Sequence, residues 1–394
     1  MIVINNKEDC CGCYACANIC PKNCLDMIMD EEGFWYPNID TNKCINCDLC
    51  VKVCPIIENK DKDKNITDNF DKKVYAAKNL NENIRINSSS GGVFTSIAEN
   101  IIEKGGVVIG VGFNERFEVV HRSVETKEEL ASVRGSKYVQ SKIGYIYREI
   151  KKELNKNRLV LFTGTPCQVY GLKKYLDREY KNLITQDIVC HGVPSPIVWE
   201  KYVGYIKSKN KYKINNIKFR DKVEGWRNYS LVFKFSNNKK TGKNINEDFY
   251  LIAFQNDIIL RNSCYECKFK GENRASDITL ADFWGIENTN INMDDNKGTS
   301  VVVINSQKGD NLFKEISKSL KTVKIDFNIA FEKNKSYYIS ANKNNSREEF
   351  LSELSENNFE TMVRRYCNYS YKVEIKKRLK KIVKKILKKI GLYK

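Results

Sequence analysis

The chain has 394 residues, a formal net charge of +18 and 15 cysteines, with 41% hydrophobic and 29% charged residues. This balance is typical of a globular protein with room for a small module and one or two ordinary domains. No run of about 18 apolar residues occurs, so we expect no membrane-spanning helix. Residues 1–7 lead straight into a cysteine-rich segment without an export signal, so we expect a cytoplasmic protein whose thiols serve metals or redox chemistry.

The positive charge is concentrated in residues 372–394, which hold eleven Lys or Arg against one acid, Glu374. The rest of the chain has no zinc-finger spacing and no strip of basic and aromatic residues, so we predict no nucleic-acid binding. Within 372–394, apolar residues recur every three or four positions, which predicts a basic amphipathic helix. Such a helix suits an anionic membrane surface or an acidic partner, or it packs on the body with its lysines in solvent.

The first 55 residues contain the same cysteine pattern twice. Each copy has the form C-x2-C-x2-C-x3-C-P, which ligates [4Fe–4S] clusters in bacterial ferredoxins, with the fourth cysteine binding the other cluster. We therefore assign a first cluster to Cys10, Cys13, Cys16 and Cys54, and a second cluster to Cys44, Cys47, Cys50 and Cys20. Zinc and disulfide bonds are the alternatives, but zinc sites usually use CxxC pairs rather than triplets followed by Cys-Pro. Cys11 and Cys24 lie outside the register and are interpreted as spare thiols.

Residues 1–58 are therefore predicted to form an α+β ferredoxin-like two-cluster module, followed by a polar linker at 59–72. Beyond the linker, short apolar strands alternate with helices, which predicts an α/β core with parallel strands. Strands are expected at 74–78, 107–113, 159–162, 183–189, 278–280 and 301–304, and helices at 93–102, 127–133, 145–154 and 169–176. We divide the core into parts at 73–158 and 159–335, with a β-rich stretch at 228–260 and a helical tail at 346–394.

Four further cysteines are placed where a ligand site is expected. Cys167 and Cys190 each follow a predicted strand, and Cys264 and Cys267 form a CxxC pair. Loops beyond the carboxyl ends of parallel strands are where ligands gather in open α/β sheets. Four thiolates there suit a third [4Fe–4S] cluster, while a redox-active Cys167, a zinc site and plain burial of small cysteines are alternatives. His191 follows Cys190 and is a candidate proton donor, unless it is only hydrogen-bonded in a loop.

A run of small residues, Ser88–Gly92, precedes a predicted helix. Free N–H groups at a helix start, flanked by hydroxyls, suit a phosphate group, although serine and glycine are also ordinary capping and turn residues. The turn Gly164–Pro166 has the same ambiguity. Neither G-x-G-x-x-G nor a Walker A sequence occurs, so standard Rossmann or P-loop nucleotide binding has no support.

Taken together, these motifs resemble those of the coenzyme F420 hydrogenase/dehydrogenase beta-subunit family, from about residue 10 to 305. The segments that carry the resemblance are Ser88–Thr95, Arg134–Gln140, Thr163–Gln168, Asp187–Pro196, Cys264–Cys267 and Ala281–Gly285. The resemblance implies a flavin-binding α/β core in which FAD contacts Ser89, Ser90, Gly91, Gly92, Thr163, Gly164 and Thr165. It also favours a cluster at the four core cysteines, but it does not transfer a substrate.

We therefore predict an iron–sulfur flavoprotein oxidoreductase that moves electrons between its [4Fe–4S] clusters and an organic hydride acceptor or donor, F420-like or other, through FAD. The expected partners are a redox protein or ferredoxin pool and a small organic substrate. One alternative is an electron-transfer subunit with no substrate site of its own. Another is a non-catalytic adaptor held at the inner membrane face by residues 372–394, serving surface-polysaccharide enzymes.

Overall fold

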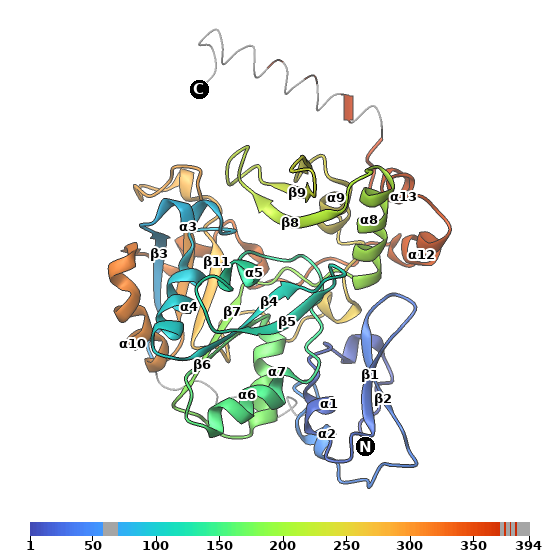
Figure 1. Cartoon of the computed structure of the whole chain (residues 1–394), viewed down its shortest axis with the longest axis vertical. Coiled ribbons are helices and arrows are strands. Elements are labelled where there is room, and N and C mark those ends of the chain that lie inside the picture. The colour runs from blue at the N-terminus through green and yellow to red at the C-terminus, as the bar shows by residue number, and fades with distance from the viewer. Residues whose placement is uncertain (58–69, 371–373, 376–378, 380–382, 384–394) are drawn as a thin grey trace.

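The computed structural model describes residues 1–57, 70–370, 374–375, 379 and 383 (Figure 1). Most of the predicted linker and of the predicted amphipathic helix at 372–394 therefore lies outside the described residues. Within the described part, a ferredoxin module lies against a core built on one large sheet, and a second, smaller sheet lies over that core. In that same part, no helix combines the length and the apolar character needed to cross a bilayer.

The large sheet is mixed. Its eight strands are β3 (Lys73–Asn79), β4 (Val107–Phe113), β5 (Val119–Val124), β6 (Val160–Gly164), β7 (Leu183–Ile188), β11 (Ile278–Asp282), β12 (Ser300–Ile304) and β13 (Leu320–Lys324), in the order β13-β3-β12-β11-β7-β6-β4-β5. The four central strands, β11, β7, β6 and β4, are parallel, which confirms the predicted α/β core. The outer strands are antiparallel to their neighbours; β4 and β5, for example, are joined by a short hairpin, which permits only that pairing.

Helices cover both faces of the large sheet. α4 (Val93–Glu103) and α10 (Gln307–Ile316) pack on one face, and α6 (Ile146–Asn155) and α7 (Pro166–Leu176) pack on the other. α7 begins three residues earlier than expected, because Thr165 and Gln168 form a capping box and Pro166 occupies the first turn. α5 (Leu130–Val133) is shorter than the helix predicted at 127–133, and α3 (Glu82–Ile86) lies between β3 and α4.

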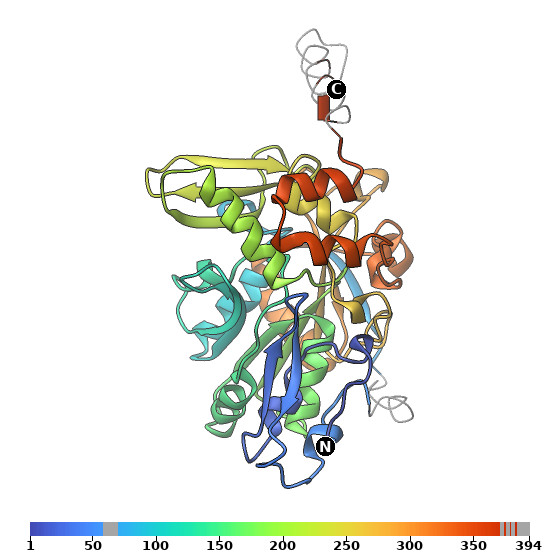
Figure 2. The ribbon, with the colours of Figure 1, turned by 90° about the vertical axis from the view of Figure 1, so that its right-hand side faces the viewer.

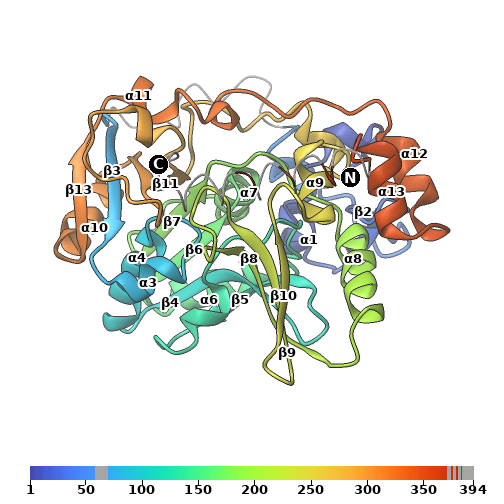
Figure 3. The ribbon, with the colours of Figure 1, turned by 90° about the horizontal axis from the view of Figure 1, so that it is seen from above.

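The smaller sheet lies beside β4 and β5, as Figure 3 shows from above. It consists of β8 (Ile214–Asp221), β9 (Ser230–Phe235) and β10 (Lys240–Asn244), and packs with α8 (Pro196–Ser208), α9 (Phe249–Gln255) and α13 (Phe359–Tyr366). The prediction of a β-rich segment at 228–260 is wrong for α9. There Asp248 caps the helix by accepting hydrogen bonds from the N–H groups of Tyr250 and Leu251. α12 (Arg347–Ser352) packs in the same hydrophobic cluster as the smaller sheet, whereas α11 (Phe327–Phe331) packs beside β3 and β12 of the large sheet.

The ferredoxin module contains α1 (Ala15–Ile19), β1 (Leu25–Met29), β2 (Trp35–Ile39) and α2 (Leu49–Lys52), with β1 and β2 forming a hairpin. It packs against α7, and Figure 2 shows the hairpin running upward beside the core. Two fully buried arginines of the core reach into it. Arg347 donates two hydrogen bonds to the Glu32 carboxylate, and Arg261 donates to the carbonyl oxygens of Cys10 and Trp35. The module is therefore anchored on the core by buried contacts.

Candidate functional site

Two hollows in the ferredoxin module are lined by cysteines. The first is lined by Cys10, Cys11, Cys13, Cys16 and Cys54. The second is lined by Cys20, Cys24, Cys44, Cys47 and Cys50. The structure thus places Cys54 with the first three cysteines of the amino-terminal copy, and Cys20 with those of the other copy. This is the arrangement in which each fourth cysteine serves the other cluster.

The two cysteine runs bend in the same way. In each run, two residues between the first three cysteines adopt the left-handed backbone conformation. They are Gly12 and Tyr14 in the first run, with φ of 66° and 64°, and Asn46 and Asp48 in the second, with φ of 52° and 55°. Left-handed residues reverse the chain sharply, so each run curls around its hollow and a short helix follows.

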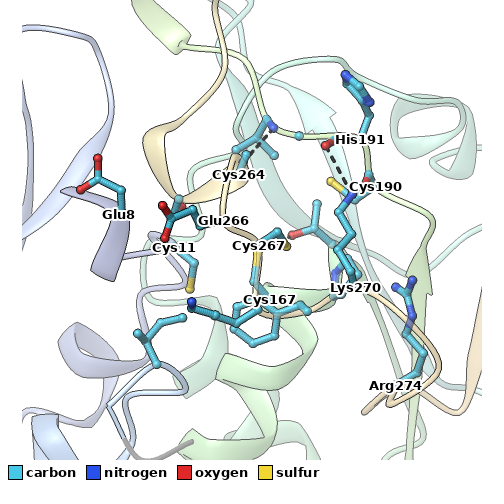
Figure 4. A pocket seen from close by; sticks show the side chains of 18 residues that line it. Glu8, Cys11, Cys167, Cys190, His191, Cys264, Glu266, Cys267, Lys270 and Arg274 are labelled. Carbon is cyan, nitrogen blue, oxygen red and sulfur yellow. Dashed lines mark hydrogen bonds between the residues drawn. The ribbon is translucent and has the colours of Figure 1, made fainter. Parts of the chain in front are cut away.

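A third cysteine-lined hollow lies at the carboxyl ends of β6 and β7 (Figure 4). Cys167 is in the first turn of α7, Cys190 follows β7, and Cys264 ends the short helix η4 (Asn262–Cys264), with Cys267 just beyond it. The structure therefore brings together the four core cysteines that the sequence singled out. Among the described residues, no group of three or more His, Cys, Asp or Glu is arranged to hold a single metal ion.

The thiols of this third hollow differ in acidity. A hydrogen bond with Cys11, supported by one from Thr165 at 3.1 Å, lowers the pKa of Cys167 to about 7, although burial opposes this. Burial raises the pKa of Cys264 to about 12, even though the Val193 N–H donates to its sulfur at 3.4 Å. Because thiolates are the form that binds metals, Cys167 is the member of the set most ready to become a ligand or a nucleophile.

Cys11 lines both the first ferredoxin hollow and the third hollow. Its side chain forms hydrogen bonds with both Cys13 and Cys167, one in each set. The amino-terminal cysteine set and the core cysteine set are therefore direct neighbours. The interpretation of Cys11 as a spare thiol overlooked this position, because the contact joins residues more than 150 positions apart and no local spacing indicates it.

His191 also lines the third hollow, but both of its ring nitrogens have protein partners. Nε2 faces the Asp257 carboxylate, and Nδ1 lies 3.2 Å from the Ser336 hydroxyl. Lys270 holds the same loop by donating to the carbonyl oxygens of Cys190 at 2.6 Å and Ser336 at 2.9 Å. These contacts fix the Cys190–His191 loop at the edge of the cysteine hollow.

The serine hydroxyls of the run Ser88–Gly92 are already hydrogen-bonded within the protein. Ser88 donates to the Ile84 carbonyl, Ser89 accepts from the Ser136 N–H, and Ser90 donates to the Thr299 carbonyl. Gly91 packs so closely on the Ala77 carbonyl that no side chain fits, and Gly92 caps α4 with φ of 85°. The run therefore shapes the start of α4, and of its expected flavin contacts only Ser89 lines a large hollow.

That large hollow measures about 1380 Å³, more than the ~300–1000 Å³ typical of small-ligand pockets. It lies between β8 and the β4–β5 hairpin. It is lined by Ser88, Ser89, Phe113, Phe117, Phe219 and the cations Arg116, Arg122, Arg134, Lys137, Lys218 and Arg220, with Glu115 and Glu118 as its acids. Within the described part of the chain, the buried Nε of Arg220 has no hydrogen-bond partner. The donor set suits an anionic ligand with an aromatic ring.

The expected contacts at Thr163–Thr165 lie elsewhere. Thr163 is buried in β6 and donates to the Ile109 carbonyl at 3.0 Å, and Thr165 lines the third cysteine hollow. The structure therefore divides the expected flavin contacts between two places. Of the cations of the large hollow, Arg134 and Lys137 lie in the segment Arg134–Gln140 that carries the family resemblance, but no ligand role was predicted for them. The others come from β8, β5 and the loop before β5, which are distant along the chain.

Comparison with known proteins agrees with this layout. The models of the coenzyme F420 hydrogenase/dehydrogenase beta subunit match residues 74–146 for its amino-terminal part and 157–328 for its carboxyl-terminal part, and a 4Fe–4S dicluster domain matches residues 9–56. The coenzyme F420-dependent sulfite reductase of Methanocaldococcus jannaschii is 26% identical over 213 residues, which is 53% of this chain and 32% of that protein. The chain thus spans about a third of the length of that relative.

Two further matches extend over more of the chain. An uncharacterized protein of the same organism is 24% identical over 335 residues, covering 77% of this chain and 86% of that protein. A chain of the F420-reducing [NiFe] hydrogenase complex from Methanosarcina barkeri aligns with a TM-score of 0.44 at 14% identity, over 73% of this chain and 90% of that one. The family models together cover more than half of the residues. The chain belongs to the coenzyme F420 hydrogenase/dehydrogenase beta-subunit family and carries a 4Fe–4S dicluster domain.

Proposed function

We propose that the chain is an iron–sulfur flavoprotein oxidoreductase that moves electrons between a redox partner and a small organic substrate. When bound, the [4Fe–4S] clusters would supply one-electron transfer and FAD would convert between single electrons and a hydride. The observation that carries the proposal is the row of three cysteine-lined hollows. The first ferredoxin hollow and the core hollow share Cys11 in their walls, so they are close enough for electron exchange.

The residues of the core fit the third cluster of this proposal. Cys167, Cys190, Cys264 and Cys267 offer four sulfurs around one hollow, and no carboxylate of the chain is needed to complete the set. The lowered pKa of Cys167 favours the thiolate that a cluster requires. The protein would hold these thiolates in fixed loops; for example, Lys270 holds the Cys190 loop by donating a hydrogen bond to the Cys190 carbonyl oxygen.

The large basic hollow supports the flavin part. Its cations, including Arg122 and Arg134, suit a pyrophosphate, and the partly exposed rings of Phe113 and Phe117 lie at its wall. The hydroxyl of Ser89 lies at its wall, as the family resemblance leads us to expect. The same cations would bind an F420-like or another anionic acceptor, so the substrate is to be identified by screening such acceptors.

The test is anaerobic purification with iron and acid-released flavin measured on the same sample. We expect about twelve irons and one FAD per chain, as three [4Fe–4S] clusters and one flavin require. Cys264→Ser should lower the iron by about four while the FAD stays. Cys367→Ser is the control, because Cys367 is also a cysteine of the core but lies at the end of α13, away from the three hollows. About eight irons and no flavin after reconstitution would contradict the proposal.

An electron-transfer subunit without its own substrate site is the second candidate. The exposed side chain of Cys47 and the neighbouring exposed Ile45 favour it, because they leave the second ferredoxin hollow open to a partner protein. Purification with a stoichiometric partner, together with no turnover of the isolated chain with any hydride acceptor, would support this candidate over the enzyme.

A further inference from the structure

Arg261 has an unusual position for a charged side chain. It is fully buried, with 0% of its surface exposed, at the junction of the ferredoxin module and the core. Its guanidinium donates to the Cys10 carbonyl at 2.8 Å, the Trp35 carbonyl at 3.0 Å and the Gln140 side-chain oxygen at 3.3 Å. All three acceptors are neutral. Among the described residues, no carboxylate lies within ion-pair distance of it, and the ring of Tyr36 lies under it at 4.1 Å.

A buried charge without a counter-charge is costly, so buried arginines are normally paired. Arg347, in the same interface, is paired with a carboxylate in the usual way. It is also 0% exposed, and its two Nη atoms donate to both oxygens of Glu32 at 3.0 and 2.7 Å. Arg261 lacks such a partner, and the ionisable groups that act on it most are the thiols of Cys10, Cys11 and Cys264 and the phenol of Tyr36.

The backbone around Arg261 holds it between two cysteine sets. Its own carbonyl accepts a hydrogen bond from the Cys264 N–H at 2.9 Å, so it begins the short helix that carries a core cysteine. On the other side, a Cβ on Gly12 would lie 3.2 Å from its Cζ and 2.6 Å from the Gln140 amide nitrogen. Only glycine permits this approach, and its φ of 66° favours glycine as well. The Arg261 guanidinium therefore packs directly against the loop that joins Cys10 to Cys13.

We propose that Arg261 is a positioning residue that raises the reduction potential of the first ferredoxin cluster, held by Cys10, Cys13, Cys16 and Cys54, above that of the second. Reduction adds one negative charge, and a fixed positive charge in a dry, low-dielectric site stabilises the reduced form. Electrons taken up at the exposed second cluster would then pass downhill toward the core. The inference rests on the iron–sulfur part of the proposed function, and it does not require FAD or a third cluster.

The test is a redox titration of the full chain, followed by electron paramagnetic resonance, in a Cys47→Ser background that keeps the first cluster. Arg261→Gln should lower the midpoint potential. At the potential where the parent is half reduced, the ratio of reduced to oxidised cluster should fall about tenfold, equivalent to ~59 mV for one electron. Arg261→Lys, which keeps the charge, should stay close to the parent. The control is the double variant Glu32→Gln, Arg347→Gln, since it loosens the same interface by removing a charge pair and leaves the net charge there unchanged.

A second variant keeps the test decisive if Arg261→Gln does not fold. Gln140→Glu has nearly the same shape and places a carboxylate beside the guanidinium, so it should also lower the potential while Arg261 stays in place. An unchanged potential in a loaded variant of either kind overturns the inference. So does an equal shift in the Glu32→Gln, Arg347→Gln double variant, or in the second ferredoxin cluster measured in a Cys54→Ser background. Failure of the parent to bind iron would instead count against the ligand assignment.

Discussion

The two cysteine sets of the ferredoxin module share one spacing and one backbone bend, but their surroundings differ. In the first set, Cys13 is 7% exposed and packs in the cluster that α1 shares with α7, and Cys54 is 8% exposed and packs in the module's own small core. In the second set, Cys47 is exposed, and its hollow is lined by Met1 and Ile45, whose side chains are exposed as well. The spacing thus determines which thiols gather, whereas contact with the core determines which set is shielded.

Under the proposed function, this difference suits the two sets to different roles in an electron route. The first set is adjacent to Cys11, Arg261 and the core hollow, so it is suited to exchange electrons with the core. The second set is farther from the core hollow and closer to solvent, so it is suited to meet a partner protein. Exposed and buried clusters also differ in reduction potential, because solvent exposure and hydrogen bonds to the sulfurs change that potential.

Removing one ligand from each set has the largest expected effect. Cys54→Ser should lower the iron content by about four per chain and disconnect the core from the module, because it removes the cluster nearest the core. Cys47→Ser should also remove about four irons, but it should leave reduction of the core by a small chemical donor intact. Iron analysis and the rate of core reduction after mixing with dithionite would measure both effects.

The crossed ligand assignment provides the control for that pair. Cys20→Ser should match Cys47→Ser in its remaining paramagnetic signal, and Cys13→Ser should match Cys54→Ser, because each pair serves one cluster. If Cys20→Ser instead matched Cys13→Ser, the fourth cysteine would serve its own run and the assignment would be wrong.

Gly171 tests whether packing on the core protects the first set. A Cβ at this position in α7 would lie 2.8 Å from the Cβ and 2.9 Å from the sulfur of Cys13. We expect Gly171→Ala to destabilise the module by about 1–3 kcal/mol, as overpacking does, and to lower occupancy of the first cluster but not the second. Chemical unfolding of the anaerobic protein, together with iron analysis, would measure this.

Gly204 is the matched control, because a Cβ there in α8 would meet nothing within 4 Å. In a helix interior, Gly→Ala is normally stabilising by about 0.5–1 kcal/mol, so Gly204→Ala should raise the free energy of unfolding slightly. If both alanine variants behaved alike, close packing of α7 on Cys13 would not be what protects the first set.

The sequence predicted those parts of the fold that local patterns determine. The strand expected at 107–113 is β4 with the same bounds. Cysteine spacing indicated the two ferredoxin sets, and the predicted strand ends together with the CxxC pair indicated the four cysteines of the core hollow. The segment 249–255 was misjudged because most of its side chains are buried, so its apolar residues carry no helical or strand period. The capping residue Asp248 was the only local signal for a helix.

The contacts that distinguish the two cysteine sets were beyond sequence patterns. Arg261 lies 251 positions from Cys10, and nothing in its neighbourhood along the chain marks it as a buried residue at a module junction. The same holds for Gly171, which looks like an ordinary small residue inside a helix. Contacts of this kind depend on how the ferredoxin module packs on the core. The spacing of residues within one segment of the sequence does not indicate that packing.

Exposure should also make the second cluster less durable in air. Of the two ferredoxin clusters, the Cys54→Ser chain keeps the second and the Cys47→Ser chain keeps the first. In a Cys264→Ser background, which removes the proposed core cluster from both, their bleaching rates can be compared directly. We expect the second cluster to bleach several-fold faster, because oxidants reach exposed thiolates and sulfides more easily than buried ones. Visible absorbance of each variant after transfer to air-saturated buffer would measure this. Equal rates would mean that burial on the core gives the first cluster no protection.

The smallest effect is expected at the fifth cysteine of each ferredoxin hollow. Cys11 stands beside the first set, and Cys24 lies 3.4 Å from the Cys20 sulfur beside the second. Each cluster already has four assigned thiolates, so Cys11→Ser and Cys24→Ser should leave the iron content unchanged. Iron analysis would check this, and a loss of about four irons in Cys24→Ser would replace Cys20 by Cys24 in the second set. The two variants should still differ in one respect: only Cys11 touches Cys167, so only Cys11→Ser should alter the signal of a cluster bound in the core.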